Sequence, residues 1–254
     1  MEEFTIEIAK GSERKPEIPI ILVYGEPGIG KTSFAATFPN PFFVQTENGF
    51  GDKIKADSLK KPVDNYKYLV DALEYFARTS HEYKTIVVDH LGGVETLIYD
   101  AILRREGGSM FAPHKDTTMI TACKGYGNAY KEALKYWRGQ FWQAVKKLQE
   151  KRIFVVLIAH RGLTTVKDPL NGDYATYAPE LREDVVAFLV KETDVILYAT
   201  RRNEAQGDSD GNPRVLKCCP TRYYFAKTRY GKKFNECGLT FEDFAKKIGY
   251  PVKQ

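Results

Sequence analysis

The chain has 254 residues, of which 43% are hydrophobic and 28% are charged, a composition typical of a globular protein with a substantial core. No apolar run approaches the roughly 20 residues of a membrane helix and the N-terminus lacks the layout of a signal peptide, so we expect a cytoplasmic protein with no membrane partner. The four cysteines have no CxxC spacing, which argues against a zinc site or a disulfide framework. The net charge is +5, with a basic surplus at residues 201–254 that suits either a nucleic-acid backbone or a solvated basic face.

Strands and helices alternate along the predicted chain. Continuous apolar runs predict strands buried on both faces of a parallel sheet, and apolar side chains at three-to-four spacing predict amphipathic helices. In chain order, the predicted elements are a strand at 20–24, a helix at 32–37, a strand at 42–45, a helix at 66–79, a strand at 85–89, helices at 94–103 and 129–151, a strand at 153–159, a helix at 181–191, a strand at 195–198, strands at 215–219 and 223–226, and a capped helix at 240–249.

These elements predict an α/β fold with a mainly parallel central sheet, helices on both faces and a late β-hairpin made by 215–219 and 223–226. We divide the chain into an N-terminal arm at 1–18, a core at 19–235, and a C-terminal short helix and tail at 236–254. Two stretches rich in glycine, proline or polar residues, 104–127 and 161–180, are predicted to be mobile loops.

One motif follows directly after the first predicted strand. Residues 25–32, GEPGIGKT, match the GxxxxGK[ST] pattern in full, and its glycines let successive backbone N–H groups turn inward around the phosphates of ATP. Lys31 would place a charge on the γ-phosphate, and Thr32 would offer its hydroxyl to Mg²⁺. A glycine-rich turn that binds nothing is the alternative. The predicted nucleotide-binding residues are Gly25, Glu26, Pro27, Gly28, Ile29, Gly30, Lys31, Thr32 and Ser33.

Three polar residues stand at the ends of predicted strands. Asp89 is the last residue of an apolar strand that we expect next to the phosphate-binding loop. From there, its carboxylate would hold Mg²⁺ through a water molecule. Glu47 follows the second strand and is the candidate to orient or deprotonate the attacking water, with Glu26 as the less favoured substitute. His160 ends the strand at 153–159, where it could sense the γ-phosphate or simply cap the strand.

The combined pattern resembles the RecA-like P-loop ATPases, and most closely the phage-encoded single-strand-annealing recombinases of the Sak type. The resemblance spans residues 18–249 and implies a RecA-like core that uses ATP and Mg²⁺. It rests on the segments 23–32, Phe38-Pro39, 47–49, the strand ending at Asp89, 158–160 and 226–231, of which only the first is specific by itself.

The resemblance also implies roles for individual residues. Lys227 and Arg229 lie in a Lys-x-Arg-aromatic-Gly element that such proteins insert into a neighbour's active site, with a solvated basic hairpin as the alternative. Glu47 would be the water-activating carboxylate. The loops at 104–127 and 161–180 would line a channel for single-stranded DNA, and the candidate DNA-binding cations are Arg104, Arg105, Lys124, Arg161 and Lys167.

Two departures from the family pattern favour a slow ATPase that acts as an assembly switch. His90 stands where related proteins often carry a serine or threonine, and Gln45 stands where they commonly carry an acid. Our first hypothesis is an ATP-dependent recombinase or annealing protein that binds single-stranded DNA and assembles with itself into a ring or filament, in the host cytoplasm if it is phage-encoded. A single-strand-binding protein is a further candidate partner. The alternative is a P-loop accessory factor, such as a helicase loader, without direct DNA binding. A nucleoside kinase would need an arginine-rich lid, for which we see no convincing candidate.

Overall fold

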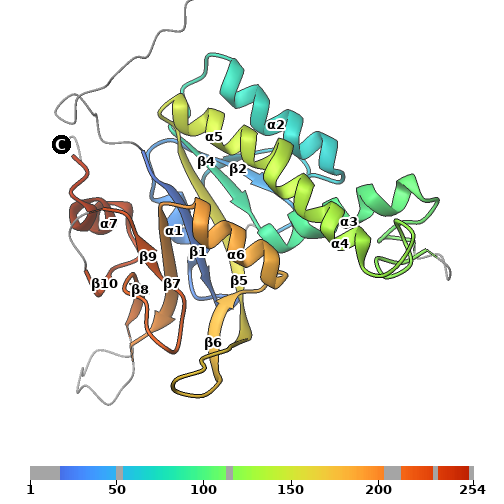
Figure 1. Cartoon of the computed structure of the whole chain (residues 1–254). Coiled ribbons are helices and arrows are strands. Elements are labelled where there is room, and N and C mark those ends of the chain that lie inside the picture. The colour runs from blue at the N-terminus through green and yellow to red at the C-terminus, as the bar shows by residue number, and fades with distance from the viewer. Residues whose placement is uncertain (1–17, 50–53, 113–116, 203–212, 231–233, 252–254) are drawn as a thin grey trace, which may run out of the picture.

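A computed structural model of the chain describes residues 18–49, 54–112, 117–202, 213–230 and 234–251, so the predicted N-terminal arm lies outside the described residues except for Ile18. At its centre is a sheet whose parallel strands follow the order β7, β1, β5, β4, β2, β3 (Figure 1). This confirms the predicted α/β fold. The strands are β1 (Ile20–Gly25), β2 (Pro41–Gln45), β3 (Asp57–Ser58), β4 (Thr85–Asp89), β5 (Phe154–Val166) and β7 (Val195–Arg201).

Helices cover both faces of this sheet (Figure 1). Strand β1 is apolar throughout because its alternate side chains enter two different cores: Ile20 and Leu22 pack with one helical layer, and Ile21 and Val23 pack with the other. The first layer holds α2 (Tyr66–Arg78), α3 (Leu91–Arg105), α4 (Asn128–Tyr136), α5 (Trp142–Glu150) and α6 (Glu183–Glu192), and the second holds α1 (Lys31–Ala36) and α7 (Phe241–Ile248).

The late strands are antiparallel, but their predicted partners were wrong. β8 (Arg214–Lys217) pairs with the end of β7 and with β10 (Glu236–Cys237), whereas β9 (Lys227–Thr228) pairs with the start of β7. The segment expected at 215–219 largely corresponds to β8, which pairs with β7 and β10. The segment expected at 223–226 is not a strand, and its Tyr224 forms an isolated bridge with Tyr177 instead.

Two other predicted elements differ from the structure. The long helix expected at 129–151 is divided into α4 and α5 by a π-helical turn, Trp137–Phe141, inside which Gly139 has non-helical dihedral angles. The loop expected at 161–180 is partly a hairpin, because β5 continues to Val166 and pairs with β6 (Tyr174–Pro179). Within the described residues, no helix is long and apolar enough to cross a membrane.

Candidate functional site

The phosphate-binding loop connects the end of β1 to the start of α1. Gly25 is required at the strand end because a Cβ there would lie 3.0 Å from the Ala199 Cβ and would overlap the Ala199 carbonyl oxygen on β7. Gly28 and Gly30 have φ values of 74° and 106°, the left-handed region that favours glycine. The sequence therefore builds the tight turn that brings backbone N–H groups to face an anion.

Lys31 lies inside this loop and is only 5% exposed. Its Nζ donates to the carbonyl oxygens of Gly25 and Glu26, at 2.9 and 2.8 Å. Burial lowers the pKa of Lys31, while the nearby carboxylates of Asp89 and Glu26 oppose that shift. The ammonium group is thus held beside the loop, where an anion would add a further counter-charge.

Thr32 and Asp89 are in contact at the carboxyl end of the parallel strands, where the Thr32 hydroxyl donates to the Asp89 carboxylate at 2.9 Å. The sequence analysis expected the strand that carries Asp89 to be adjacent to the phosphate loop. This was wrong, because β5 lies between β1 and β4. Burial raises the pKa of Asp89, and the hydrogen bond from Thr32 partly offsets this effect. A hydroxyl and a carboxylate are the oxygen donors that Mg²⁺ accepts beside phosphate oxygens, so this pair fits the metal.

Glu47 lies just beyond β2, which pairs with β4, so it is further from the phosphate loop in strand order than predicted. It nevertheless lines the same cavity, of about 640 Å³, as Lys31, Thr32 and Asp89. Buried Gln45 also lines this cavity. The predicted chemical groups therefore line one cavity despite the separation of their strands in the sheet.

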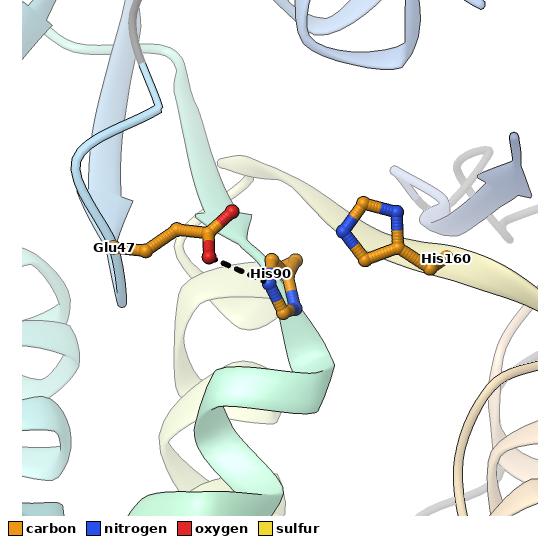
Figure 2. Close-up of side chains that lie close together, drawn as sticks. All are labelled: Glu47, His90 and His160. Carbon is orange, nitrogen blue, oxygen red and sulfur yellow. Dashed lines mark ion pairs between the residues drawn. The ribbon is translucent and has the colours of Figure 1, made fainter. Parts of the chain in front are cut away.

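His160 faces this cavity from β5, and its ring packs edge-on against the ring of His90, with centroids 4.6 Å apart. Figure 2 shows the Glu47 carboxylate directed toward His90, with the His160 ring on the other side. Burial, followed by the positive charge of Lys31, lowers the pKa of His160, so its ring is neutral at pH 7. Its Nδ1 is buried and has no hydrogen-bond partner among the residues that the structure describes.

Arg214 also reaches the phosphate loop, and the sequence analysis did not identify it. It lies on β8, its guanidinium is 3.4 Å from the carbonyl oxygen of Ile29, and it lines the cavity beside Lys31. An arginine in a basic C-terminal region has no local signal for this position, because the contact depends on how β8 pairs with β7.

The candidate DNA-binding cations are mostly paired within the chain. Arg161 forms an ion pair of 2.6 Å with Glu26 of the phosphate loop and lies over the Tyr177 ring, which connects the hairpin to the nucleotide site. Lys124 is exposed. The remaining ion pairs are Arg104 with Asp100, Arg105 with Glu132, and Lys167 with Asp173.

Lys227 and Arg229 lie near the start of β7, at the opposite end of the sheet from the phosphate loop. Lys227 Nζ donates to the carbonyl oxygens of Val190, Lys191 and Thr193, at the C-terminal end of α6. Arg229 pairs with buried Asp194 at 2.8 Å. Both cations thus have partners in their own chain, and their action in a neighbouring site stays a prediction.

The glycine-rich loop, the buried lysine and the threonine–aspartate pair at the carboxyl ends of parallel strands define a P-loop nucleoside triphosphatase. The family comparison agrees: a model described as an AAA domain matches residues 19–230, so the chain belongs to this AAA domain family. Membership supports nucleotide binding and ATPase activity in general. No curated protein matches the chain. The closer resemblance to Sak-type recombinases stays a prediction.

Proposed function

We propose that the chain hydrolyses ATP slowly, at the cavity formed by the phosphate loop, Thr32, Asp89, Glu47 and His160. The observation that carries this proposal is the hydrogen bond between Thr32 and Asp89, because it joins the end of the phosphate loop to the acid of a different strand. Thr32 and Asp89 would hold Mg²⁺, which neutralises charge on the phosphates when it is bound.

The other groups have separate tasks in this mechanism. Lys31 contacts the γ-phosphate and stabilises the charge that develops there. Glu47 orients the attacking water and accepts its proton, since its carboxylate faces the same cavity. His160 contributes a neutral ring to the cavity wall, where it can register the presence of the γ-phosphate without repelling Lys31.

We further propose that the nucleotide state controls binding to single-stranded DNA during annealing or recombination, by a homo-oligomer in the cytoplasm. Support comes from the segment after α3, where Phe111 is 61% exposed and Tyr126 is 98% exposed, close in sequence to exposed Lys124. Exposed aromatic rings and cations together suit base stacking and backbone contact.

A specific observation favours the second candidate, a P-loop accessory factor that acts through protein contacts. Four of the five candidate DNA-binding cations, Arg104, Arg105, Arg161 and Lys167, form ion pairs within the chain, which reduces the charge that they offer to a phosphate backbone. Under this alternative, the Glu26–Arg161 pair transmits the nucleotide state to the β5–β6 hairpin, where a protein partner would bind.

Fluorescence anisotropy with labelled oligo(dT), with ATP or ADP and at several salt concentrations, separates the two candidates. DNA binding predicts an affinity that falls steeply with salt and drops when Lys124 and Tyr126 are both replaced by alanine. Lys246→Ala, at an exposed position on α7, is the matched control and should bind like the wild type. Absence of binding in every nucleotide state would refute the DNA proposal and leave the accessory-factor alternative.

A further inference from the structure

Glu47 is more exposed than expected for a residue that must orient a water molecule. Its side chain is 60% exposed, and it lies on the segment that follows β2 rather than inside the sheet. A free glutamate at such a position samples several rotamers, which disperses the carboxylate over a volume larger than one reacting water requires. The contacts around it must therefore fix its orientation.

The backbone next to Glu47 is anchored by Thr46. The Thr46 N–H donates to the Asp89 carbonyl oxygen at 2.8 Å, and the Thr46 hydroxyl accepts from the His90 N–H at 3.0 Å and donates to the His90 carbonyl oxygen at 3.1 Å. A Cβ on Gly93 would overlap this hydroxyl, so glycine at the start of α3 permits the close approach. The segment before Glu47 is thereby joined to the residues that follow β4.

His90 adds a contact to the carboxylate itself, and its tautomer is fixed by the helix that it caps. The Gly93 N–H donates to Nδ1 of His90 at 3.2 Å, as in an N-cap of α3. Because Nδ1 accepts a hydrogen bond, the proton of the neutral ring resides on Nε2. Nε2 lies 3.3 Å from Oε2 of Glu47, so the protonated nitrogen is the one next to the carboxylate (Figure 2).

We propose that His90 is a positioning residue that holds the carboxylate of Glu47 toward the nucleotide cavity through its Nε2–H. The inference rests on the proposed role of Glu47 in hydrolysis and assigns a role to the residue that follows Asp89. The His90 side chain is only 14% exposed and packs against the His160 ring, so it is itself held in place. Polar contacts in a site without substrate are often long and tighten when substrate binds.

A metal ion is the competing occupant of this cluster, because Glu47, His90 and His160 each offer one atom and these atoms lie within 4.8 Å of one another. Two histidines and a carboxylate are also a zinc ligand set. The surrounding contacts oppose it. A metal-bound histidine normally donates its second N–H to an acceptor. Nδ1 of His90 instead faces an N–H donor, and Nδ1 of His160 has no partner within the described part of the chain.

His90→Asn separates the contact to Glu47 from the helix cap. The asparagine oxygen can accept from the Gly93 N–H in place of Nδ1, but its short side chain does not reach the Glu47 carboxylate. We expect a melting temperature near that of the wild type, a KM for ATP within about threefold, and a kcat lowered by about tenfold, because only the orientation of the water is affected. A wild-type kcat in this variant would overturn the proposal.

In a second pair of variants, both substitutions remove the N-cap of α3, and only one of them keeps a hydrogen-bond donor for the Glu47 carboxylate. His90→Gln offers an amide N–H at a reach similar to Nε2, and His90→Met fills a similar volume without it. We expect the two proteins to have similar melting temperatures and the glutamine variant to retain the higher kcat. Equal kcat values would show that His90 has only a structural role and would overturn the proposal.

A double-mutant cycle distinguishes failure of this inference from failure of the proposed function. Glu47→Gln should lower kcat by about 100-fold or more, and adding His90→Asn to it should cause no further loss. If Glu47→Gln retains the wild-type kcat, the proposed role of Glu47 is wrong and this inference falls with it. If only His90→Asn is without effect, or if its loss persists beside Glu47→Gln, the positioning role alone is wrong. Calorimetric titration with ZnCl₂ should show no tight binding; tight binding that His160→Ala abolishes would establish the metal site instead.

Discussion

Replacing Arg229 by alanine tests whether this cation stabilises its own chain or completes a neighbour's active site. In the structure, Arg229 pairs with Asp194 at 2.8 Å and donates to the Lys191 carbonyl oxygen at 2.5 Å. Asp194 is 8% exposed in its side chain, and its other donors are the Ile20 N–H and Gln149 Nε2, at 2.9 and 2.8 Å. The alanine variant therefore leaves a buried carboxylate with two neutral donors and, among the described residues, only the more distant charge of Lys227 beside it.

The magnitude follows from these contacts. Removal of one partner from a fully buried ion pair costs about 3–5 kcal/mol. The Arg229 side chain is 48% exposed, so water screens the pair, and Asp194 keeps its two other donors. We therefore expect Arg229→Ala to lower the free energy of unfolding by about 1–2 kcal/mol.

Urea unfolding measures this loss, with Lys246→Ala as an exposed control expected to change stability by less than about 0.5 kcal/mol. The loss should not depend on protein concentration, because the contacts are within one chain. An Arg229→Ala protein with wild-type stability but with lost turnover would refute the structural role. Mixing it with Lys31→Ala protein would then restore some ATPase activity through hybrid interfaces, as the trans-acting hypothesis predicts.

Three further substitutions test the site. Lys31→Ala should remove the stabilisation by MgATP, which for the wild type at 100 times the dissociation constant is about 2.7 kcal/mol; thermal unfolding with and without nucleotide measures it, and an unchanged shift would contradict the role of the loop. Gly25→Ala should cost about 3 kcal/mol in urea unfolding, because its Cβ would overlap the Ala199 carbonyl oxygen, and a fully stable variant would contradict that packing. Asp89→Asn should abolish hydrolysis yet stabilise the nucleotide-free protein. Burial raises the pKa of Asp89 in the folded state, so above that pKa the ionised carboxylate destabilises the fold. The increase in unfolding free energy caused by asparagine should therefore shrink as the pH falls through this pKa. An increase that grows toward acid pH would contradict this argument.

The parts of the site that the sequence predicted are those with local signals. The loop at 25–32 is defined by glycines and a lysine at fixed spacing, and Asp89 by the apolar strand before it. Each of these signals arises within about ten residues, where strand, turn and helix preferences act together. The same locality explains why the buried strands were predicted well.

The parts that the sequence did not predict depend on contacts between distant segments. Arg214 reaches Ile29 across 185 positions, and Lys227 caps α6 because β9 pairs with β7. The spatial order of strands, which places β5 between β1 and β4, also has no local signal. A cation's partner is determined by this long-range geometry, so the sequence could identify basic residues but could not assign Arg161 to Glu26.

This strand order has a consequence for how the site is assembled. Asp89 and Glu47 reach the cavity from β4 and from the segment after β2, with β5 between them and the phosphate loop, so no single turn fixes the distance from the loop to the water-orienting group. That distance is set instead by the register of β5 against its neighbours and by the contacts of Thr46 with the residues after β4. Since β5 continues into the hairpin with β6, a partner that displaces the hairpin would move His160 and the phosphate-loop partner Arg161 together. We therefore expect the position of the hairpin to influence turnover, and turnover that is insensitive to Glu26→Gln and Arg161→Gln would contradict this expectation.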